Sequence, residues 1–539
     1  MVRRKKGIVV GLSLLFSLLI LSPLSSAETE IPPLSKEVES AVAHLPIQHN
    51  GRVKPFDSFA RETLGLITGS ATFGRGTPVE TVLNIVAYPE KWENEPILSV
   101  PYHPLRQELG FSPKKSHISY NDLFAVAFMK RLPAIVQKQE ANEKLTLLEN
   151  ETMELYFRFT SLHGLFTQEL KLIPSENRRD VVWNTPSQPF EEFQNFLAAY
   201  RERDEGKMLQ HLQTMSERIH TQYPLAMPED WRLQLEVLYH RIDPLRLAWI
   251  FYGLSALLLS ASLGRPFRRG HPVALTVFII AMVLHAGGIV TRVVLAGRPP
   301  VSNFYESMLW LPFITVILGF VFELRSRATY FCLSAALFGG VTLLLSEHLP
   351  LDPSIQPIVA VLRSNKWLAI HVLTIVSSYG ILTFATGIAH FYGGSFLFQK
   401  RDPLPLLGDT LYRVIQIGVI FLATGIMLGA VWANASWGRY WGWDPKETWA
   451  LITLLWFLAL LHARKASWIG GPGLAVGTIL GFFLLLMTYY GVSFYLVGLH
   501  SYAGGSAKPI PPLLIAYLIA ELMFVVGVVL SVFRRRRVA

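Results

Sequence analysis

The chain has 539 residues, of which 51% are hydrophobic and 16% are charged, and its mean hydropathy is +0.35. This composition excludes an ordinary soluble protein and indicates a chain that crosses the membrane several times. The net charge of +10 is expected in cytoplasmic loops of such a protein, so no nucleic-acid partner is predicted. The single cysteine, Cys332, excludes a disulfide, a CxxC redox pair and an iron–sulfur ligand set within the chain.

The first 27 residues resemble a signal peptide or an uncleaved N-terminal anchor. Basic residues at 2–6 precede an apolar run at 7–21, and small residues at 25–27 resemble a cleavage site. In either case, the segment is expected to send the following residues across the membrane.

Residues 28–244 are mixed and charged, and contain no apolar run of membrane length. Helical periodicity around Leu145–Leu165 and Pro189–His220 predicts a mostly helical extracytoplasmic domain with its own core. Its opening phrase, LPIQHNGRVKPFDSFARETL, contains basic side chains that we interpret as a solvated face, with anion binding as the alternative. These basic residues are Arg52, Lys54 and Arg61.

Residues 245–533 form a series of membrane-length apolar runs, followed by a basic tail at 534–539. About nine spans are expected after the signal, so the fold class is an all-α polytopic membrane protein. The expected spans lie near Leu245–Leu263, Pro272–Leu295, Ser307–Phe322, Thr329–Leu345, Trp367–Phe398, Tyr412–Val431, Thr448–Leu461, Leu474–Tyr490 and Pro511–Val532.

The basic loops fix the predicted orientation of these spans. If every run crosses once, the basic clusters between the spans, the basic N-terminus and the basic tail all fall on one side, which is then the cytoplasm. The tryptophan-rich stretch Trp432–Thr448 is consequently expected outside, on the same face as the soluble domain.

Trp432–Thr448 reads WANASWGRYWGWDPKET and is the densest aromatic segment of the chain. Asp444, Pro445 and Glu447 have the spacing of a helix cap, a first helical residue and a capping box. Two interpretations of the rings stay open: an aromatic belt at the membrane–water interface, or a flat platform for a planar ligand.

Two histidines are predicted on the same outer face as this stretch. His371 lies just inside the outer end of the fifth expected span, and His500 follows the eighth. Two neutral imidazoles facing each other are a common way to hold haem iron from both sides, and intramembrane ionisable residues are usually functional. The alternative is that each histidine caps a helix or is satisfied at the interface.

Other polar residues of the membrane part have weaker patterns. His462 lies at the cytoplasmic end of its span, where snorkelling to water is the alternative role. His285 is mid-span, with a buried structural role and a haem role left open, and His390 has only weak claims. Asn303 and Glu306 have capping-box spacing.

Four motifs in the same order resemble those of CcsA-type (ResC-type) cytochrome c biogenesis proteins. They are TRVVLAGRPPVSNFYES, NKWLAIHVLTIVSSYG, WANASWGRYWGWDPKETW with LLH beyond it, and VGLHSYAGG. The resemblance covers Leu245–Val532 and includes the WWD signature of haem-handling proteins. It implies export of haem b, and its covalent attachment to the CxxCH motif of apocytochrome c on the outer face of a bacterial cytoplasmic membrane.

The resemblance also implies a set of site residues. His371 and His500 would be outer haem ligands beside the WWD loop, and His462 would hold haem inside the membrane before export. A second intramembrane histidine would come from a CcsB-type (ResB-type) subunit, with His285 as the internal alternative. Other expected contacts of the haem are Trp437, Trp441 and Trp443 against its ring, Arg439 and Lys446 with a propionate, and Asp444, for which helix capping is the first role expected.

Competing functions remain open on the sequence alone. A haem transporter without attachment activity needs the same haem site. A quinone-linked b-type electron-transfer protein would need histidine pairs at two depths, and the inner pair here is incomplete.

Overall fold

The computed structural model describes residues 33–125, 128–141, 143–172, 191–264, 270–349, 351–356, 366–399, 403–500 and 510–538. The expected signal segment 1–27 and several of the basic loops used for the orientation lie outside the described residues. The chain separates into two compact units, Met1–Ile242 and Asp243–Ala539.

The N-terminal unit is mostly helical. The first periodic segment forms α9 (Leu147–Phe166). The second forms two helices, α10 (Glu191–Glu202) and α11 (Glu205–Gln222), which are separated at Arg203 (φ 59°). Asp204 then caps α11. Two short antiparallel hairpins complete it, β1 (Pro46–His49) with β2 (Arg52–Pro55) and β3 (Leu98–Ser99) with β4 (His117–Ile118). The helices are α2 (Lys36–Ala43), α3 (Phe56–Thr68), α4 (Pro78–Ala87), α5 (Pro89–Trp92), α6 (His103–Glu108), α7 (Tyr120–Ala125), α8 (Leu132–Glu140), α9 (Leu147–Phe166), α10 (Glu191–Glu202), α11 (Glu205–Gln222) and α12 (Asp230–Ile242).

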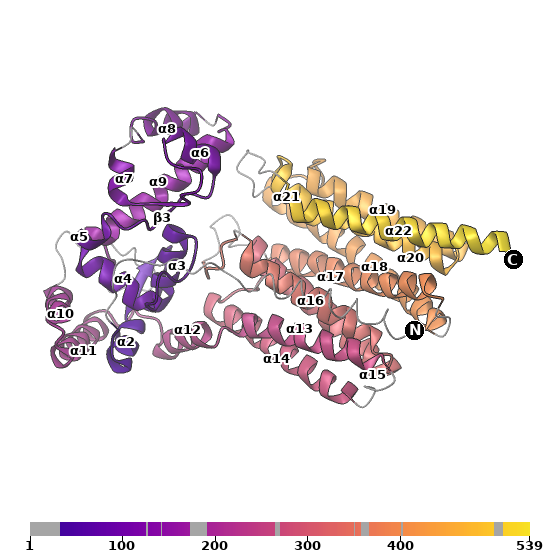
Figure 1. The fold of residues 1–539 in the computed structure, drawn as a ribbon, viewed down its shortest axis with the longest axis horizontal. Coiled ribbons are helices and arrows are strands. Elements are labelled where there is room, and N and C mark those ends of the chain that lie inside the picture. The colour runs from indigo at the N-terminus through magenta and orange to yellow at the C-terminus, as the bar shows by residue number, and fades with distance from the viewer. Residues whose placement is uncertain are drawn as a thin grey trace. The chain divides into compact units, whose positions relative to one another are not determined.

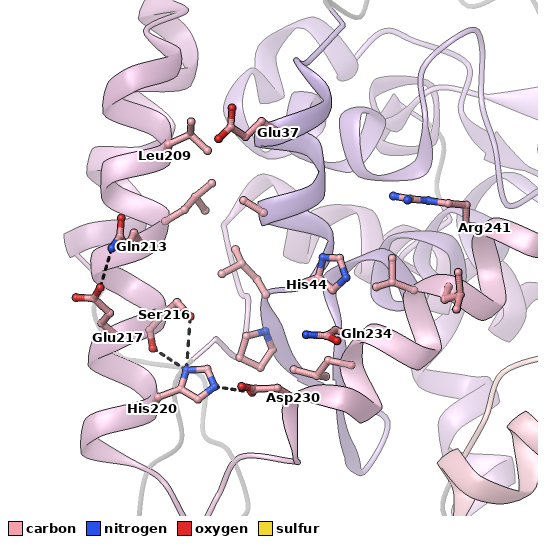
Figure 2. Close-up of a pocket in the computed structure, with 17 residues that line it drawn as sticks. Glu37, His44, Leu209, Gln213, Ser216, Glu217, His220, Asp230, Gln234 and Arg241 are labelled. Atoms are coloured by element: carbon pink, nitrogen blue, oxygen red, sulfur yellow. Dashed lines mark hydrogen bonds and ion pairs between the residues drawn. The ribbon is translucent and has the colours of Figure 1, made fainter.

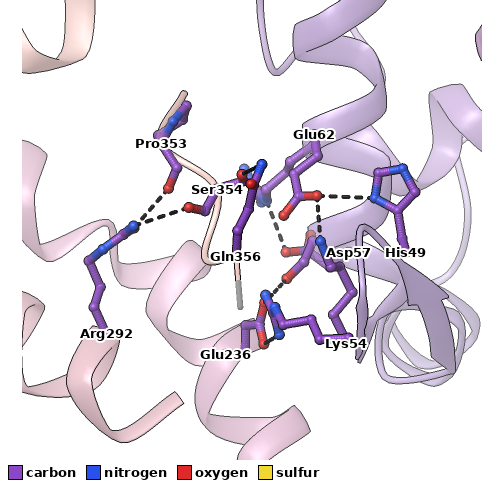
Figure 3. Close-up of polar contacts among 12 residues, drawn as sticks. His49, Lys54, Asp57, Glu62, Glu236, Arg292, Pro353, Ser354 and Gln356 are labelled. Atoms are coloured by element: carbon purple, nitrogen blue, oxygen red, sulfur yellow. Dashed lines mark hydrogen bonds and ion pairs between the residues drawn. The ribbon is translucent and has the colours of Figure 1, made fainter. Parts of the chain in front are cut away.

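The expected solvated face of the opening motif is wrong for Lys54 and Arg52, whereas Arg61 is partly exposed and pairs with Asp57 at 2.9 Å. The Lys54 side chain is 0% exposed, and its Nζ lies 2.6 Å from Oε2 of Glu62, which also lies 3.2 Å from His49 Nδ1 (Figure 3). Arg52 donates to Glu236 Oε2 at 2.8 Å. The motif therefore ties the β1–β2 hairpin to α3 and α12 by buried ion pairs, which hydropathy cannot distinguish from a solvated face.

A groove lies between α2, α11 and α12, with a cavity volume of about 830 Å³ (Figure 2). Its lining combines aliphatic side chains of α11 and α12 with polar side chains. One of the polar lining residues, His220, bonds through both ring nitrogens, to the Ser216 carbonyl at 2.8 Å and to Asp230 Oδ1 at 3.1 Å. These bonds indicate a structural role for His220.

The second unit confirms the expected polytopic architecture, because the described residues contain nine helices long and apolar enough to cross a membrane. Neighbouring helices such as α13 and α14, or α17 and α18, run side by side (Figure 1). The helices are α13 (Pro244–Ser262), α14 (His271–Ala296), α15 (Phe304–Ser326), α16 (Tyr330–His348), α17 (Lys366–Leu397), α18 (Leu404–Trp437), α19 (Pro445–Lys465), α20 (Gly471–Leu486) continued by the π turn η3 (Met487–Gly491) and α21 (Val492–Tyr495), and α22 (Pro512–Val538).

Several helices extend beyond their expected apolar runs, and α18 and α22 are two clear examples. α18 continues past Val431 to Trp437 and ends at Gly438, whose φ of 71° suits glycine. α22 continues through most of the basic tail to Val538. Hydropathy marks where a segment is apolar, whereas the helix itself continues until its backbone is capped.

Glu62 supplies a test of the buried ion pairs. Burial opposes its charge, but hydrogen bonds from His49 and Lys54 and the Lys54 charge outweigh it and lower its pKa below the usual 4.5. A carboxylate with a lowered pKa stabilises the fold above pH 4.5, and this stabilisation is lost as the pH falls through the folded value. We expect Glu62→Gln to destabilise the N-terminal unit by about 3 kcal/mol at pH 7, because Lys54 stays buried without its counter-ion.

The measurement is pulse proteolysis of the full-length protein in detergent across a urea series, repeated from pH 7 to pH 4. The difference between wild type and Glu62→Gln should shrink below pH 4.5. Glu108→Gln is the control, since its pair with Arg131 is exposed and should contribute less than about 1 kcal/mol. A stability difference between wild type and Glu62→Gln that does not change with pH would contradict the assignment of Glu62 as the buried counter-ion of Lys54.

Candidate functional site

Elements distant in the sequence bring His371 and His500 into one aromatic cluster. The ring of Trp432, near the end of α18, stacks on His371 with centroids 6.3 Å apart and planes 9° apart. The same Trp432 ring lies 6.1 Å from the His500 ring, and Trp437 meets His500 edge to face at 5.6 Å. The two histidines expected as a pair therefore border the same tryptophan.

The orientation of His371 is fixed by the backbone of α18. Its Nδ1 lies 2.8 Å from the carbonyl oxygen of Gly425. A carbonyl can only accept, so Nδ1 carries the proton and Nε2 of the neutral ring keeps its lone pair. Gly429 makes this approach possible, because a Cβ there would lie 2.6 Å from Cε1 of His371.

His500 is held by the carboxylate of Asp444. Its Nδ1 lies 2.9 Å from Oδ1, while Oδ2 accepts the backbone N–H of Leu499 at 2.6 Å. Burial alone would raise the pKa of Asp444, but hydrogen bonds from His500 and from the Lys446 and Leu499 backbone outweigh it and hold the pKa below its usual range. An ionised Asp444 accepts from Nδ1–H, which leaves Nε2 of His500 available as a ligand.

Asp444 also begins α19, as its spacing predicts. Its side chain accepts from the Lys446 N–H, and Glu447 completes the capping box by accepting from the Asp444 N–H at 3.2 Å. Glu447 also accepts from the Gly442 N–H at 2.8 Å. One helix cap therefore fixes both the end of the tryptophan-rich stretch and the position of the His500 partner.

The aromatic rings do not form one flat platform. Trp432 and Trp437 meet at 68°, with centroids 4.7 Å apart, and Trp441 and Trp443 meet at 89° and 5.7 Å. Trp443 is 71% exposed and has a φ of 56°, which is uncommon for a bulky residue. Trp432 is buried, and its Nε1 has no hydrogen-bond partner among the described residues. The site therefore offers edges and faces at several angles, together with one unused buried donor.

The side chains of the two basic residues in Trp432–Thr448 have different surroundings. Arg439 is exposed, and its guanidinium lies against Gly442, where a Cβ would approach Cζ within 2.4 Å. Lys446 instead donates from Nζ to the Tyr489 carbonyl at 3.1 Å and to Ser493 Oγ at 2.9 Å. Arg439 is therefore the more accessible of these two cations.

The other candidate histidines lie in different surroundings. His462 is exposed, and within the described part of the chain its Nδ1 alone is bonded, to the Leu458 carbonyl at 2.7 Å. His285 is 0% exposed; its Nε2 lies 3.0 Å from the Leu309 carbonyl and its Nδ1 lies 3.4 Å from the Tyr252 hydroxyl. These bonds favour the structural alternative for His285. His390 is likewise bonded through both nitrogens, to Thr386 and Glu521.

The first motif of the membrane unit forms a buried charge cluster at the start of α15. Asn303 caps the helix by accepting from the Glu306 N–H at 2.7 Å, as expected. The Glu306 carboxylate is 2.6 Å from Arg298 and 3.4 Å from Arg292. Arg292 also donates to the Pro353 and Ser354 carbonyls (Figure 3). These ion pairs and hydrogen bonds hold the loop that precedes α15 in place.

Comparison with known proteins matches residues 301–500 to the Cytochrome C assembly protein family. The chain is 34% identical over 268 residues to the cytochrome c biogenesis protein CcsA of Trieres chinensis, covering 84% of that protein and 42% of this chain. The CcsA of Guillardia theta is 36% identical over 243 residues, which is 79% of that protein and 39% of this chain. The chain belongs to this family. It is a multi-pass membrane protein with a role in cytochrome c maturation.

A second kind of relative also matches the N-terminal unit. Protein NrfI of Wolinella succinogenes is 30% identical over 547 residues, which cover 93% of this chain. The chain spans 59% of the length of NrfI. The family match at residues 301–500 contains His371, His462 and His500.

Three features of the site are not predicted from the sequence. Trp432 is not predicted beside His371 and His500, although its ring borders both. Gly425 and Gly429 are not singled out, although their spacing of four on one helix is a known signal for close helix approach. Gly498, where a Cβ would lie 2.5 Å from Asp444 Oδ2, was visible only as part of a motif.

Gly429 provides a test of the close approach of α17 and α18. We expect Gly429→Ala to lower the stability of the membrane unit by about 1–3 kcal/mol, because the added methyl overlaps the His371 ring. Gly394→Ala on α17 is the matched control, since a Cβ there meets nothing within 4 Å and should not destabilise. Thermal unfolding in detergent compares the two variants, and equal melting temperatures would contradict the packing described.

Proposed function

We propose that the protein presents haem b on the outer face of a bacterial cytoplasmic membrane and attaches it to the CxxCH motif of apocytochrome c. The observation that carries the proposal is the pair of imidazoles beside Trp432. Both use Nδ1 in a hydrogen bond, to Gly425 in one case and Asp444 in the other, so each keeps Nε2 for iron. Ligand histidines are commonly oriented in this way by a carbonyl or a carboxylate.

The surrounding residues suit the rest of a haem molecule. Trp437, Trp441 and Trp443 would pack against the ring, since aromatic groups favour edge-to-face and offset contacts. Arg439 is exposed at the rim and would pair with a propionate, as charge-assisted hydrogen bonds to carboxylates are strong. Lys446 is not assigned this role, because its ammonium group is directed to Tyr489 and Ser493.

Attachment requires no nucleophile from this chain. The substrate supplies two thiols, and bound haem supplies the vinyl groups to which they add. The chain's own cysteine, Cys332, is buried and takes no part. His371 and His500 would hold the iron and so restrict the orientation of the haem relative to the incoming thiols, because orientation removes a large entropic barrier. A histidine of the apocytochrome would then replace one of them.

Delivery of haem from the inner side is assigned to His462. Its Nε2 has no partner among the described residues, and its side chain is exposed, so a ligand from another subunit can complete the site. We propose a CcsB-type subunit as the source of that ligand. The alternative function, haem export without attachment, uses the same residues and differs only in the final step.

Substitution of the outer ligands tests the proposal. We expect His371→Ala and His500→Ala each to lose most of the bound haem and to stop cytochrome c maturation, since one imidazole holds iron poorly. Added imidazole should restore part of both activities by occupying the vacant coordination position. The measurements are the haem content of the purified protein and haem-staining of a co-expressed cytochrome c.

His348→Ala is the matched control, because this histidine bonds the Leu344 carbonyl at the end of α16 and has no assigned role. Unchanged haem content in both ligand variants would contradict the outer site. The wild-type protein is also expressed without other maturation components. If it then carries a normal amount of haem but the co-expressed cytochrome c stays unstained, the result would favour haem export alone.

The inner site gives a separate prediction. We expect His462→Ala to reduce maturation strongly and His285→Ala to be milder, because His285 is enclosed and already bonded through both nitrogens. The assay is maturation with and without a co-expressed CcsB-type subunit. Full maturation without that subunit, abolished by His285→Ala, would reverse the assignment.

A further inference from the structure

A chain of hydrogen bonds runs from the start of α15 to the π turn. Ser307 Oγ donates to the Phe304 carbonyl at 2.8 Å, so its own oxygen is left to accept from the Tyr489 hydroxyl at 2.7 Å. The rings of Phe304 and Tyr489 also stack, with centroids 4.8 Å apart. These contacts hold Tyr489 against the start of α15. The buried Arg292–Glu306–Arg298 cluster holds the same helix start in place.

The same tyrosine holds Lys446. The Tyr489 carbonyl, within η3, accepts from Lys446 Nζ at 3.1 Å and from Ser493 Oγ at 2.7 Å. Lys446 Nζ also donates to Ser493 Oγ at 2.9 Å. Single π turns inside α-helices are frequent at functional sites, where they redirect carbonyls and side chains.

Lys446 stands one residue from the start of α19, next to the carboxylate that holds His500. Its backbone N–H donates to Asp444 Oδ1 at 2.9 Å, and the same oxygen lies 2.9 Å from His500 Nδ1. The Lys446 side chain thus anchors the first turn of α19 from one side, while Asp444 holds the imidazole from the other.

We propose that Lys446 and Tyr489 are positioning residues for His500, acting through Asp444. The inference rests on the proposed function, because it takes His500 to be a haem ligand. A ligand must be held within about 0.5 Å of its productive position, and His500 itself lies outside any helix. The bonded route through Lys446 and Tyr489 supplies that rigidity from α15 and η3.

The test uses Lys446→Met, which keeps the aliphatic stem, and Tyr489→Phe, which removes only the hydroxyl. Lys465→Met at the exposed far end of α19 and Tyr490→Phe, whose ring meets that of Tyr495 edge to face, are the matched controls. Haem retention in detergent should weaken about 10-fold in Lys446→Met and about fivefold in Tyr489→Phe, with little change in the controls. Tyr489→Phe keeps the test informative if Lys446→Met does not accumulate.

Two further readouts separate positioning from a general structural role. Imidazole should restore haem retention to Lys446→Met as it does to His500→Ala, and the double variant should be no weaker than His500→Ala alone. In the haem-free protein, the Leu499 amide should exchange with deuterium faster in Lys446→Met, because its acceptor Asp444 is less firmly held.

Additive losses in the double variant, or retention and Leu499 exchange equal to wild type, would overturn the inference. A wild-type protein that binds no haem would instead remove the proposed function. In that case the deuterium exchange of the Leu499 amide is the deciding measurement. Faster exchange in Lys446→Met supports the positioning of the His500 segment by Lys446, and unchanged exchange refutes it.

Discussion

The hydrogen bonds of the Asp444 carboxylate are the interactions on which the proposed haem site depends. The carboxylate caps α19, accepts the Leu499 N–H and accepts from His500 Nδ1. Each of these bonds is stronger because the carboxylate is charged, and together they hold its pKa low. A single buried anion therefore joins the end of the tryptophan-rich stretch to the segment that carries His500.

The second half of the site depends on close packing rather than charge. Glycines at positions 418, 425 and 429 line one side of α18, and side chains of α17 occupy the space that a Cβ would fill at each. This approach lets the Gly425 carbonyl reach the His371 imidazole and lets Trp432 stack on its ring. The hydrophobic effect does not drive helices together within a membrane, so helix association depends on close packing, which small residues allow. The two proposed ligands are thus fixed by different physical means, one by a backbone carbonyl and one by a carboxylate.

The sequence predicts those parts of the structure that are encoded locally. The spans follow from runs of apolar residues, and the capping box at Asp444 and Glu447 follows from a spacing of three. Contacts between distant segments could not be predicted in this way. Lys54 looks like part of a solvated face until the structure places it with 0% exposure beside Glu62. Trp432 likewise looks like a belt residue until α17 brings His371 against it.

The central claim is that His371 and His500 bind one haem iron through Nε2. The most direct measurement is the low-temperature electron paramagnetic resonance spectrum of the purified ferric protein, taken with wild type and with the His462→Ala variant that lacks the proposed inner ligand. The account predicts a low-spin signal typical of two imidazole ligands, retained in His462→Ala. A high-spin signal, or a low-spin signal that disappears in His462→Ala while His371 and His500 are intact, would contradict it.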